Sequence, residues 1–247
     1  MQIFPLAEGV FTVDRTKVFM PFILGKDQLQ ERPVGSLLVE VQPFLVQTSR
    51  DLILLDTGLG FRENSQLQIC ANIENAGFLA TDVTKVLLSH LHKDHAGGIC
   101  FINEFGEIKP VFPNATYYVN EKELSFSLEK PSSSYVATSG IFLGSYENVQ
   151  LLNGDGFIDG YIEYRLSGGH APFHQVFWIR ENGAIIFYGG DEAPQLQQMK
   201  NKIIAKYDFN GRLSMQMRQA WWEQGNSENW TFLFYHDVKT PLYQKGS

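Results

Sequence analysis

The sequence is poor in cysteine and in basic residues, and no apolar run reaches the length of a membrane span. Its two cysteines, Cys70 and Cys100, are too few for a disulfide framework and are expected to be buried thiols. Twenty Lys and Arg stand against 27 Asp and Glu, which gives a net charge of −7. This balance argues against nucleic acid as the main partner, because phosphate binding requires a basic surface.

Targeting and low-complexity segments are also missing. Residues 1–8 lack the basic region and following apolar region of a secretory signal. This favours a cytoplasmic protein with no membrane partner. No repeat or linker interrupts the chain, so residues 1–247 are predicted to form one domain. Apolar residues at 44% and aromatic residues at 13% can fill a sizeable core.

Short apolar, β-branched runs recur along the chain and predict a strand-rich protein. Strands are expected at residues 10–14, 36–41, 43–47, 52–55, 83–88, 117–119, 148–152, 156–166, 173–180, 184–188 and 230–235. Helical spacing of apolar residues predicts helices over 65–76, 121–128 and 213–224. The stripe of Met215, Met217, Trp221 and Trp222 in the last helix is expected to pack in the core rather than bind a cofactor.

Two irregular stretches have more than one interpretation. Residues 15–36 are unusually apolar for a loop. They are either strand and core filler, or an arm that walls a pocket or contacts a second copy of the chain. Residues 131–147 are rich in Ser, Gly and aromatics, which fits a lid over a substrate or a plain surface connection.

The densest chemical signal is a cluster of histidines directly after the strand predicted at 83–88. His90, His92, Asp94 and His95 stand within six residues, and small residues follow them. Imidazole and carboxylate are ligands for Zn, Fe, Mn or Co. Alternate side chains of a compact loop, His90 and His92, can bind one ion, while Asp94 and His95 face a second ion. A chance polar loop is the weaker interpretation, since so many polar groups beside a core strand need partners.

Three further ligand-type residues each end an apolar run of their own. They are His170, Asp191 and His236. Each alone could be a buried core histidine or an aspartate that caps a helix. Together with the first cluster they favour one metal site at the ends of several strands.

This order of residues, from Asp56-Thr57-Gly58 to His236-Asp237, resembles the metallo-β-lactamase superfamily in its dinuclear metallohydrolase form. The resemblance implies an α+β fold, the αββα sandwich, with two divalent metal ions at one edge. Zinc is the first expectation for the metal, with Fe, Mn and Co as alternatives. Within the superfamily the chain looks most like the quorum-quenching lactonase branch.

The resemblance also implies a role for each site residue. The first metal would take His90, His92 and His170, and the second would take Asp94, His95 and His236. Asp191 would bridge the two ions, and Asp94 and Asp191 would take part in catalysis. Asp56 would orient a metal-binding histidine, and His174 would be a structural neighbour rather than a ligand.

A hydroxide held between two metals suits hydrolysis of an ester-type bond. The substrate would be a small molecule, with a lactone first and a thioester, phosphoester or phosphotriester as alternatives. One position departs from the lactonases, which place a tyrosine three residues after the bridging aspartate, where this chain has Pro194. A metal-binding interaction module without turnover is the alternative outside enzymes.

Overall fold

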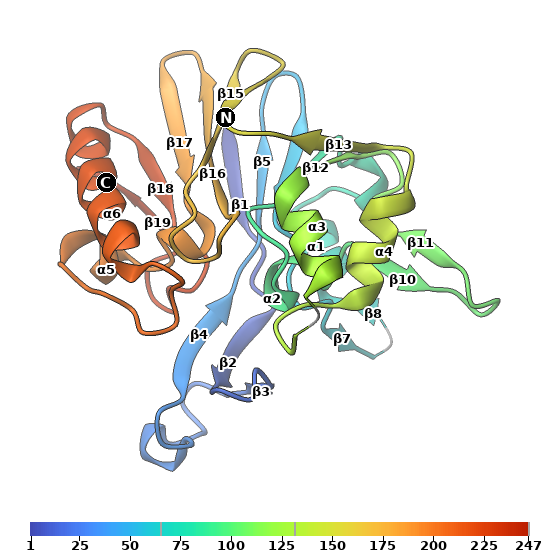
Figure 1. The fold of residues 1–247 in the computed structure, drawn as a ribbon, viewed down its shortest axis with the longest axis horizontal. Helices are drawn as coiled ribbons and strands as arrows, with labels where there is room; N and C mark the ends of the chain where they lie inside the picture. The colour runs from blue at the N-terminus through green and yellow to red at the C-terminus, as the bar shows by residue number, and fades with distance from the viewer. Residues whose placement is uncertain (65, 131, 247) are drawn as a thin grey trace.

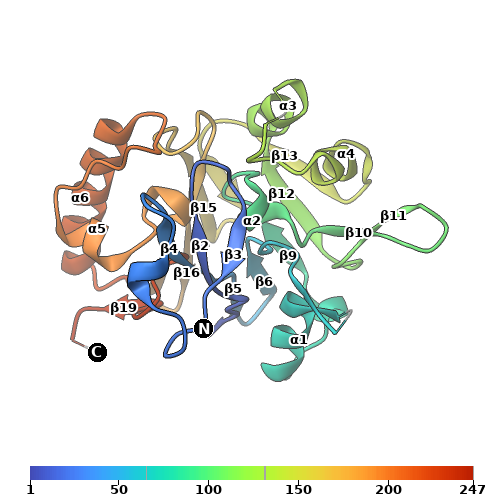
Figure 2. The ribbon, with the colours of Figure 1, turned by 90° about the horizontal axis from the view of Figure 1, so that it is seen from below.

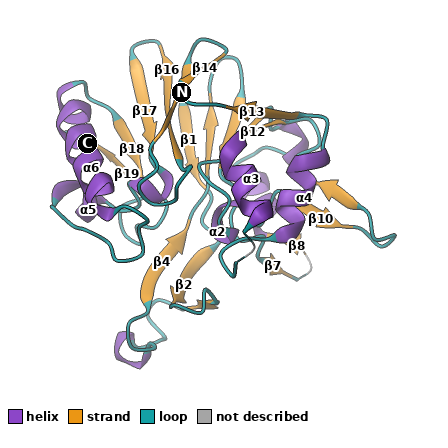
Figure 3. Cartoon of the chain, in the orientation of Figure 1, coloured by secondary structure: helices purple, strands orange, loops and turns teal. Residues whose placement is uncertain are grey.

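Two six-stranded sheets packed face to face form the centre of the molecule, and helices cover the outer face of each sheet (Figure 1). The computed structural model describes residues 1–64, 66–130 and 132–246. One layer of helices lies outside the first sheet and another lies outside the second sheet (Figure 3). The predicted αββα sandwich is confirmed.

The first sheet has the order β1-β5-β6-β9-β12-β13. Its strands are β1 (Gln2–Pro5), β5 (Phe44–Gln47), β6 (Leu52–Leu55), β9 (Lys85–Leu87), β12 (Thr116–Asn120) and β13 (Val149–Leu152). From β6 to β13 all neighbours are parallel. The helices on its outer face are α1 (Gln68–Asn75), α3 (Glu121–Glu129) and α4 (Ala137–Ser145).

The second sheet has the order β14-β15-β16-β17-β18-β19. Its strands are β14 (Gly156–Ile158), β15 (Ile162–Leu166), β16 (Gln175–Glu181), β17 (Ala184–Tyr188), β18 (Thr231–Leu233) and β19 (Leu242–Gln244). Only β17 and β18 are parallel neighbours. The helices outside it are α5 (Leu196–Lys200) and α6 (Gly211–Ser227).

Three apolar clusters hold the four layers together. Alternate residues of a central strand point to opposite faces, so Ile53 and Leu55 enter the cluster between the sheets while Leu54 packs under α1. Strands buried on both faces read as continuous apolar runs, which is why their positions were readable in the sequence. The third cluster joins the second sheet to α5 and α6 and includes Trp178 and Trp230.

A three-stranded arm leaves the sandwich at one edge (Figures 1 and 2). It consists of β2 (Gly9–Val13), β3 (Phe19–Pro21) and β4 (Leu37–Val41), with the turn η1 (Leu29–Glu31) at its far end. The arm supplies residues to the wall of the cavity described below. Of the interpretations offered for residues 15–36, an arm that walls a pocket is therefore the one that the structure supports, because Arg15, Lys17, Phe19 and Gly35 line the cavity.

The remaining elements are small. They are the hairpins β7 (Arg62–Glu63) with β8 (Gln66–Leu67) and β10 (Cys100–Ile102) with β11 (Ile108–Pro110), the turns η2 (Ala80–Asp82) and η3 (Gly190–Glu192), and the short helix α2 (Lys93–Ala96). Among the helices of the described residues, none is long and apolar enough to cross a membrane.

Several predictions of local structure and burial were wrong, and two of them extend to residues outside the described ranges. Residues 156–166 form two strands joined by a turn rather than one strand. The second half of the histidine cluster lies on α2 and not in a loop. The stretch 131–147 mostly forms α4, which packs on the first sheet. Both cysteines are half-buried rather than buried. Ser65 and Pro131, which begin two of the predicted stretches, lie outside the described residues.

Candidate metal centre

The predicted ligands meet at one edge of the sandwich because the strands that precede them run in the same direction. His90 and His92 follow β9, while Asp94 and His95 lie on α2 just beyond. Asp191 follows β17 and His236 follows the parallel strand β18. Carboxyl ends of parallel strands meet at the same edge of a sheet, where α/β proteins place their sites. All seven predicted ligands fall into two groups with metal-site geometry.

The first group contains His90, His92, His170 and Asp191. His90 Nε2 lies 2.9 Å from His92 Nδ1, and His170 Nε2 lies 3.2 Å from the same atom. Ligand atoms of one tetrahedral zinc ion, each about 2.0–2.1 Å from the metal, lie about 3.4 Å apart. Three ring nitrogens therefore converge at nearly the spacing that one ion requires.

The second group contains Asp94, His95 and His236. Asp94 Oδ2 lies 3.6 Å from His95 Nε2 and 3.4 Å from His236 Nε2. All three side chains are buried. Tyr235 donates its hydroxyl to the Asp94 carbonyl at 2.5 Å, which ties the start of α2 to the segment after β18 that carries His236.

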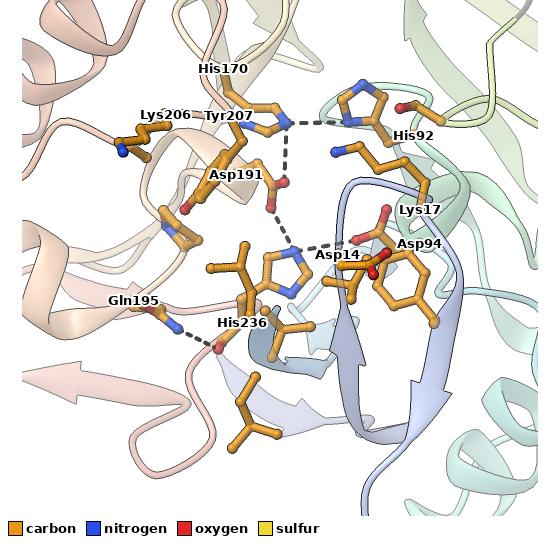
Figure 4. Close-up of a pocket in the computed structure, with 18 of the residues that line it drawn as sticks. Asp14, Lys17, His92, Asp94, His170, Asp191, Gln195, Lys206, Tyr207 and His236 are labelled. Atoms are coloured by element: carbon orange, nitrogen blue, oxygen red, sulfur yellow. Dashed lines mark hydrogen bonds and ion pairs between the residues drawn. The ribbon is translucent and has the colours of Figure 1, made fainter. Parts of the chain in front are cut away.

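Asp191 lies between the two groups (Figure 4). Its Oδ2 is 3.2 Å from His170 Nε2 of the first group. Its Oδ1 is 3.1 Å from His95 Nε2 and 2.9 Å from His236 Nε2 of the second group. One carboxylate thus faces ring nitrogens on both sides. The alternative role of Asp191 as a helix cap is not what the structure shows, since α5 begins after Gln195 and its first N–H, that of Leu196, donates to Asp237 Oδ2 at 3.0 Å.

Asp56 fixes the orientation of His95. His95 Nδ1 lies 2.7 Å from Asp56 Oδ2, and Ser89 donates both its backbone N–H and its hydroxyl to the same carboxylate. Tyr188 donates its hydroxyl there as well. Asp56 has a left-handed φ of +54°, a conformation that few non-glycine residues adopt. The N–H of His95 therefore points at Asp56, and its Nε2 is left to face the centre.

His170 has an equivalent partner that the sequence did not reveal. Its Nδ1 lies 3.1 Å from Asp208 Oδ1, and its backbone N–H donates to Glu192 Oε2 at 2.6 Å. The buried Arg218 then donates to the Glu192 carbonyl at 3.0 Å and lies 3.9 Å from Asp208. Asp208 sits 38 residues after His170 in an irregular segment, so no sequence spacing marks it.

The remaining histidines follow the same pattern. His236 Nδ1 donates to the Glu40 carbonyl at 2.6 Å, and His90 Nδ1 lies 3.1 Å from the Ser89 hydroxyl. His174 lies outside both groups, and its Nδ1 lies 3.0 Å from the Ser167 hydroxyl.

Two glycines allow the ligand loops to pack this closely. A Cβ on Gly190 would lie 2.7 Å from Ser89 Oγ, and the residue has a φ of +48°. A Cβ on Gly169 would lie 2.0 Å from Glu192 Oε1. Any side chain at either position would push away a group that orients a ligand, so both positions require glycine.

The electrostatics of the buried groups call for cations between them. Burial alone would raise the pKa of Asp191, yet His236, His95 and His170 hold it well below its usual value. Burial would likewise lower the pKa of His236, but Asp191 and Asp94 raise it to about 10. His95 Nε2 and Asp191 Oδ1 are buried and lack a hydrogen-bond partner among the described residues. Metal ions placed between imidazoles and carboxylates would satisfy these atoms, so the residues fit a metal pair.

A cavity of about 690 Å³ opens above the two groups. Its wall includes His92, Asp94, His170, Asp191 and His236 together with apolar residues from the arm. The position of the lactonase tyrosine is occupied by the buried Pro194, which lines the cavity without a hydroxyl. Tyr207, which the sequence analysis did not single out, lines the same cavity.

The fold and the paired His/Asp groups define the metallo-hydrolase type of αββα protein. The sequence model of the metallo-beta-lactamase superfamily matches residues 39–218 of this chain. The chain therefore belongs to this superfamily.

Curated relatives are N-acyl homoserine lactonases named AttM. The protein from Agrobacterium fabrum is 33% identical over an alignment of 143 residues, and the match covers 53% of this chain and 49% of that protein. The protein from Azorhizobium caulinodans is 32% identical over an alignment of 120 residues, and the match covers 44% of this chain and 41% of that protein. The aligned part spans about half the length of these curated relatives or less.

Solved structures share the fold at low sequence identity. A probable metal-dependent hydrolase from Staphylococcus aureus has a TM-score of 0.75 at 21% identity, covering 98% of this chain and 91% of that one. The dizinc quorum-quenching lactonase AidC has a TM-score of 0.72 at 20% identity, covering 97% and 88%. These likenesses show a common αββα architecture over nearly the whole chain.

Removal of the carboxylate partner of each histidine should weaken one metal group at a time. Asp56→Ala frees His95, and Asp208→Ala frees His170. Each change is expected to lower metal affinity by roughly 10–100-fold. Asp56→Ala should also lower the free energy of unfolding by about 1–3 kcal/mol, because Ser89 and Tyr188 lose their acceptor. Calorimetric titration of the metal-free variants with Zn²⁺ and thermal melting measure the two effects.

The matched control is Asp155→Ala, which removes a carboxylate that accepts from the Leu166 N–H at 2.8 Å. It should cost some stability and leave both metal affinities unchanged. Wild-type affinities in Asp56→Ala and Asp208→Ala would show that neither carboxylate orients a ligand.

Proposed function

We propose that this protein is a metal-dependent hydrolase that opens an ester-type bond, with a lactone as its first candidate substrate. The observation that carries the proposal is the position of the Asp191 carboxylate, whose two oxygens face one ligand group each. The choice of a lactone is supported by the lactonase relatives, whose sequences match this chain over about half of their own length. Zinc is the first candidate metal, because the donors are imidazoles and carboxylates.

His90, His92 and His170 would hold one ion, and Asp94, His95 and His236 would hold the other, with Asp191 shared. When bound, such a metal pair lowers the pKa of water towards 7 and polarises a substrate carbonyl. The chain's own part is to fix the ligands. The ring nitrogens of His95, His170 and His236 that point away from the centre are held by Asp56, Asp208 and the Glu40 carbonyl, which fixes the orientation of these three rings.

The cavity above the centre supplies binding and orientation. Tyr207 comes from the segment before α6, and its ring centroid lies 5.9 Å from that of His170. Its hydroxyl accepts a hydrogen bond from Gln198 Nε2 at 3.0 Å. A phenol keeps its proton at neutral pH, and the structure records no acceptor for this proton within residues 1–64, 66–130 and 132–246. Tyr207 can thus donate to a substrate oxygen. It would take the role of the lactonase tyrosine, whose position in this chain is occupied by Pro194.

The function is tested with a panel of substrates on metal-loaded protein. Lactones, aryl esters, thioesters and phosphotriesters are offered at equal concentration, with and without prior removal of metal by a chelator. We expect lactone or ester hydrolysis that disappears with the metal and returns when Zn²⁺ is added. A metal-loaded, folded protein that turns over no member of the panel would support the non-enzymatic metal-binding module instead.

Substitution of Tyr207 tests its proposed hydrogen bond. Tyr207→Phe should lower kcat/KM for the best substrate by about 2- to 13-fold, the worth of one hydrogen bond to a substrate oxygen. Metal content should stay at the wild-type level. Tyr146→Phe is the matched control, since the Tyr146 hydroxyl donates to the Pro113 carbonyl and does not line the cavity. Equal kinetics for the two variants would remove Tyr207 from the mechanism.

A further inference from the structure

The fold gathers basic side chains around the cavity of an acidic protein. The cavity wall contains Arg15, Lys17, Lys93 and Lys206, which come from three separate parts of the chain. Among the described residues that line this wall, Asp14 is the only carboxylate outside the two metal groups. The whole chain carries a net charge of −7, so this local excess of positive charge reverses the overall balance. Charge of one sign around a cleft attracts ligands of the opposite sign.

Lys17 is held in place by its backbone. It closes a turn in which its N–H donates to the Asp14 carbonyl at 3.0 Å, and its own carbonyl accepts from Lys93 Nζ at 2.9 Å. Its φ is +60°, a left-handed conformation that is unfavourable for a lysine. Unfavourable backbone conformations that are held by surrounding contacts concentrate at ligand-binding sites.

The ammonium group of Lys17 has no recorded use inside the protein. Among the residues that the structure describes, no hydrogen bond or ion pair involves Lys17 Nζ, although the side chain is half-buried. In Figure 4 the side chain extends from the tip of the arm toward His92. The nearby Asp14 forms no recorded ion pair with Lys17 among the described residues, and its Oδ1 accepts from the N–H and the hydroxyl of Thr16 at 2.9 and 2.6 Å.

Lys206 extends the basic wall on the other side of Tyr207 (Figure 4). It is exposed, and no ion pair to it is recorded among the described residues. Apolar side chains of the same wall include Val13, Phe19 and Leu37 from the arm. A ligand that fits this wall has both an apolar part and a negative charge.

We propose that the substrate is an ester or lactone that also carries a carboxylate, and that Lys17 binds this carboxylate while Lys206 adds long-range attraction. The proposal rests on the proposed hydrolase function and specifies its substrate class. Pairing with a carboxylate would satisfy the ammonium group of Lys17, which is half-buried and has no partner within residues 1–64, 66–130 and 132–246.

The test compares two esters that differ only in charge. They are the 4-nitrophenyl ester of hexanedioic acid with its second carboxyl group free, and the same compound with that group methylated. At low ionic strength we expect kcat/KM to be about tenfold higher for the free acid, as for one charge-assisted contact. The preference should shrink as salt is added, since exposed charges are screened.

Three variants locate the source of the preference. Lys17→Met should bring the ratio of the two kcat/KM values close to one by lowering only the value for the free acid. Lys206→Met should reduce the ratio in part. Lys26→Met removes the same charge from an exposed position of the arm outside the cavity wall, and it should leave the ratio unchanged.

Binding is measured independently of turnover. The butylamides that match the two esters resist hydrolysis, and calorimetric titration of metal-loaded protein should show tighter binding of the anionic amide, lost in Lys17→Met. Equal loss of rate on both esters in Lys17→Met would overturn the proposal and indicate a role at the reacting oxygen. So would a preference that survives in both lysine variants, because the carboxylate would then sit at the metals.

Different results would refute the proposed hydrolase function and the proposed anion site. Absence of any metal-dependent hydrolysis, with the amide preference intact, refutes the hydrolase but keeps the anion site. Hydrolysis of both esters at equal rates in the wild type keeps the hydrolase and refutes the anion site.

Discussion

The structure of this site depends on one buried carboxylate that faces imidazoles on both sides. Asp191 has three ring nitrogens within 3.2 Å, and their other nitrogens are held by Asp56, Asp208 and the Glu40 carbonyl. With their N–H groups pointing outward, the inward nitrogens present lone pairs to the carboxylate unless they carry a proton. Without a positive charge between them, these groups would repel one another in a poorly solvated space. Metal ions meet that requirement and provide chemistry at the same time.

The αββα fold provides enough stability to offset the free-energy cost of burying these polar groups. The ligands sit on connections beyond strand ends, while the strands themselves are packed between apolar clusters on both faces. Asp56 and Lys17 each have a left-handed backbone conformation, and the packing of a large core can offset the free energy that this conformation costs. The arm adds the outer wall of the cavity and carries the lysine that we assign to substrate recognition.

Much of the fold, and the clustering of the candidate ligands, could be predicted from the sequence, for physical reasons. Strands buried on both faces, such as β6 and β9, are continuous apolar runs, and His90 and His236 come soon after such runs. His170 follows the alternating strand β15 after three small residues. Asp208, Tyr207 and Lys17 could not be found in this way. They lie in irregular segments without periodicity, and their partners are distant in the sequence. The basic wall was invisible for the same reason, because the fold assembles it from separated residues.

The most direct test of the account is the number of metal ions per chain, counted by native mass spectrometry in wild-type protein and in Asp191→Asn. The account predicts about two ions in the wild type, as a shared carboxylate requires, and loss from both sites in the variant. His236→Ala, measured alongside, should keep the first ion, since three protein ligands suffice for zinc. Two ions retained in Asp191→Asn, or a wild-type protein that binds only one, would contradict the bridge.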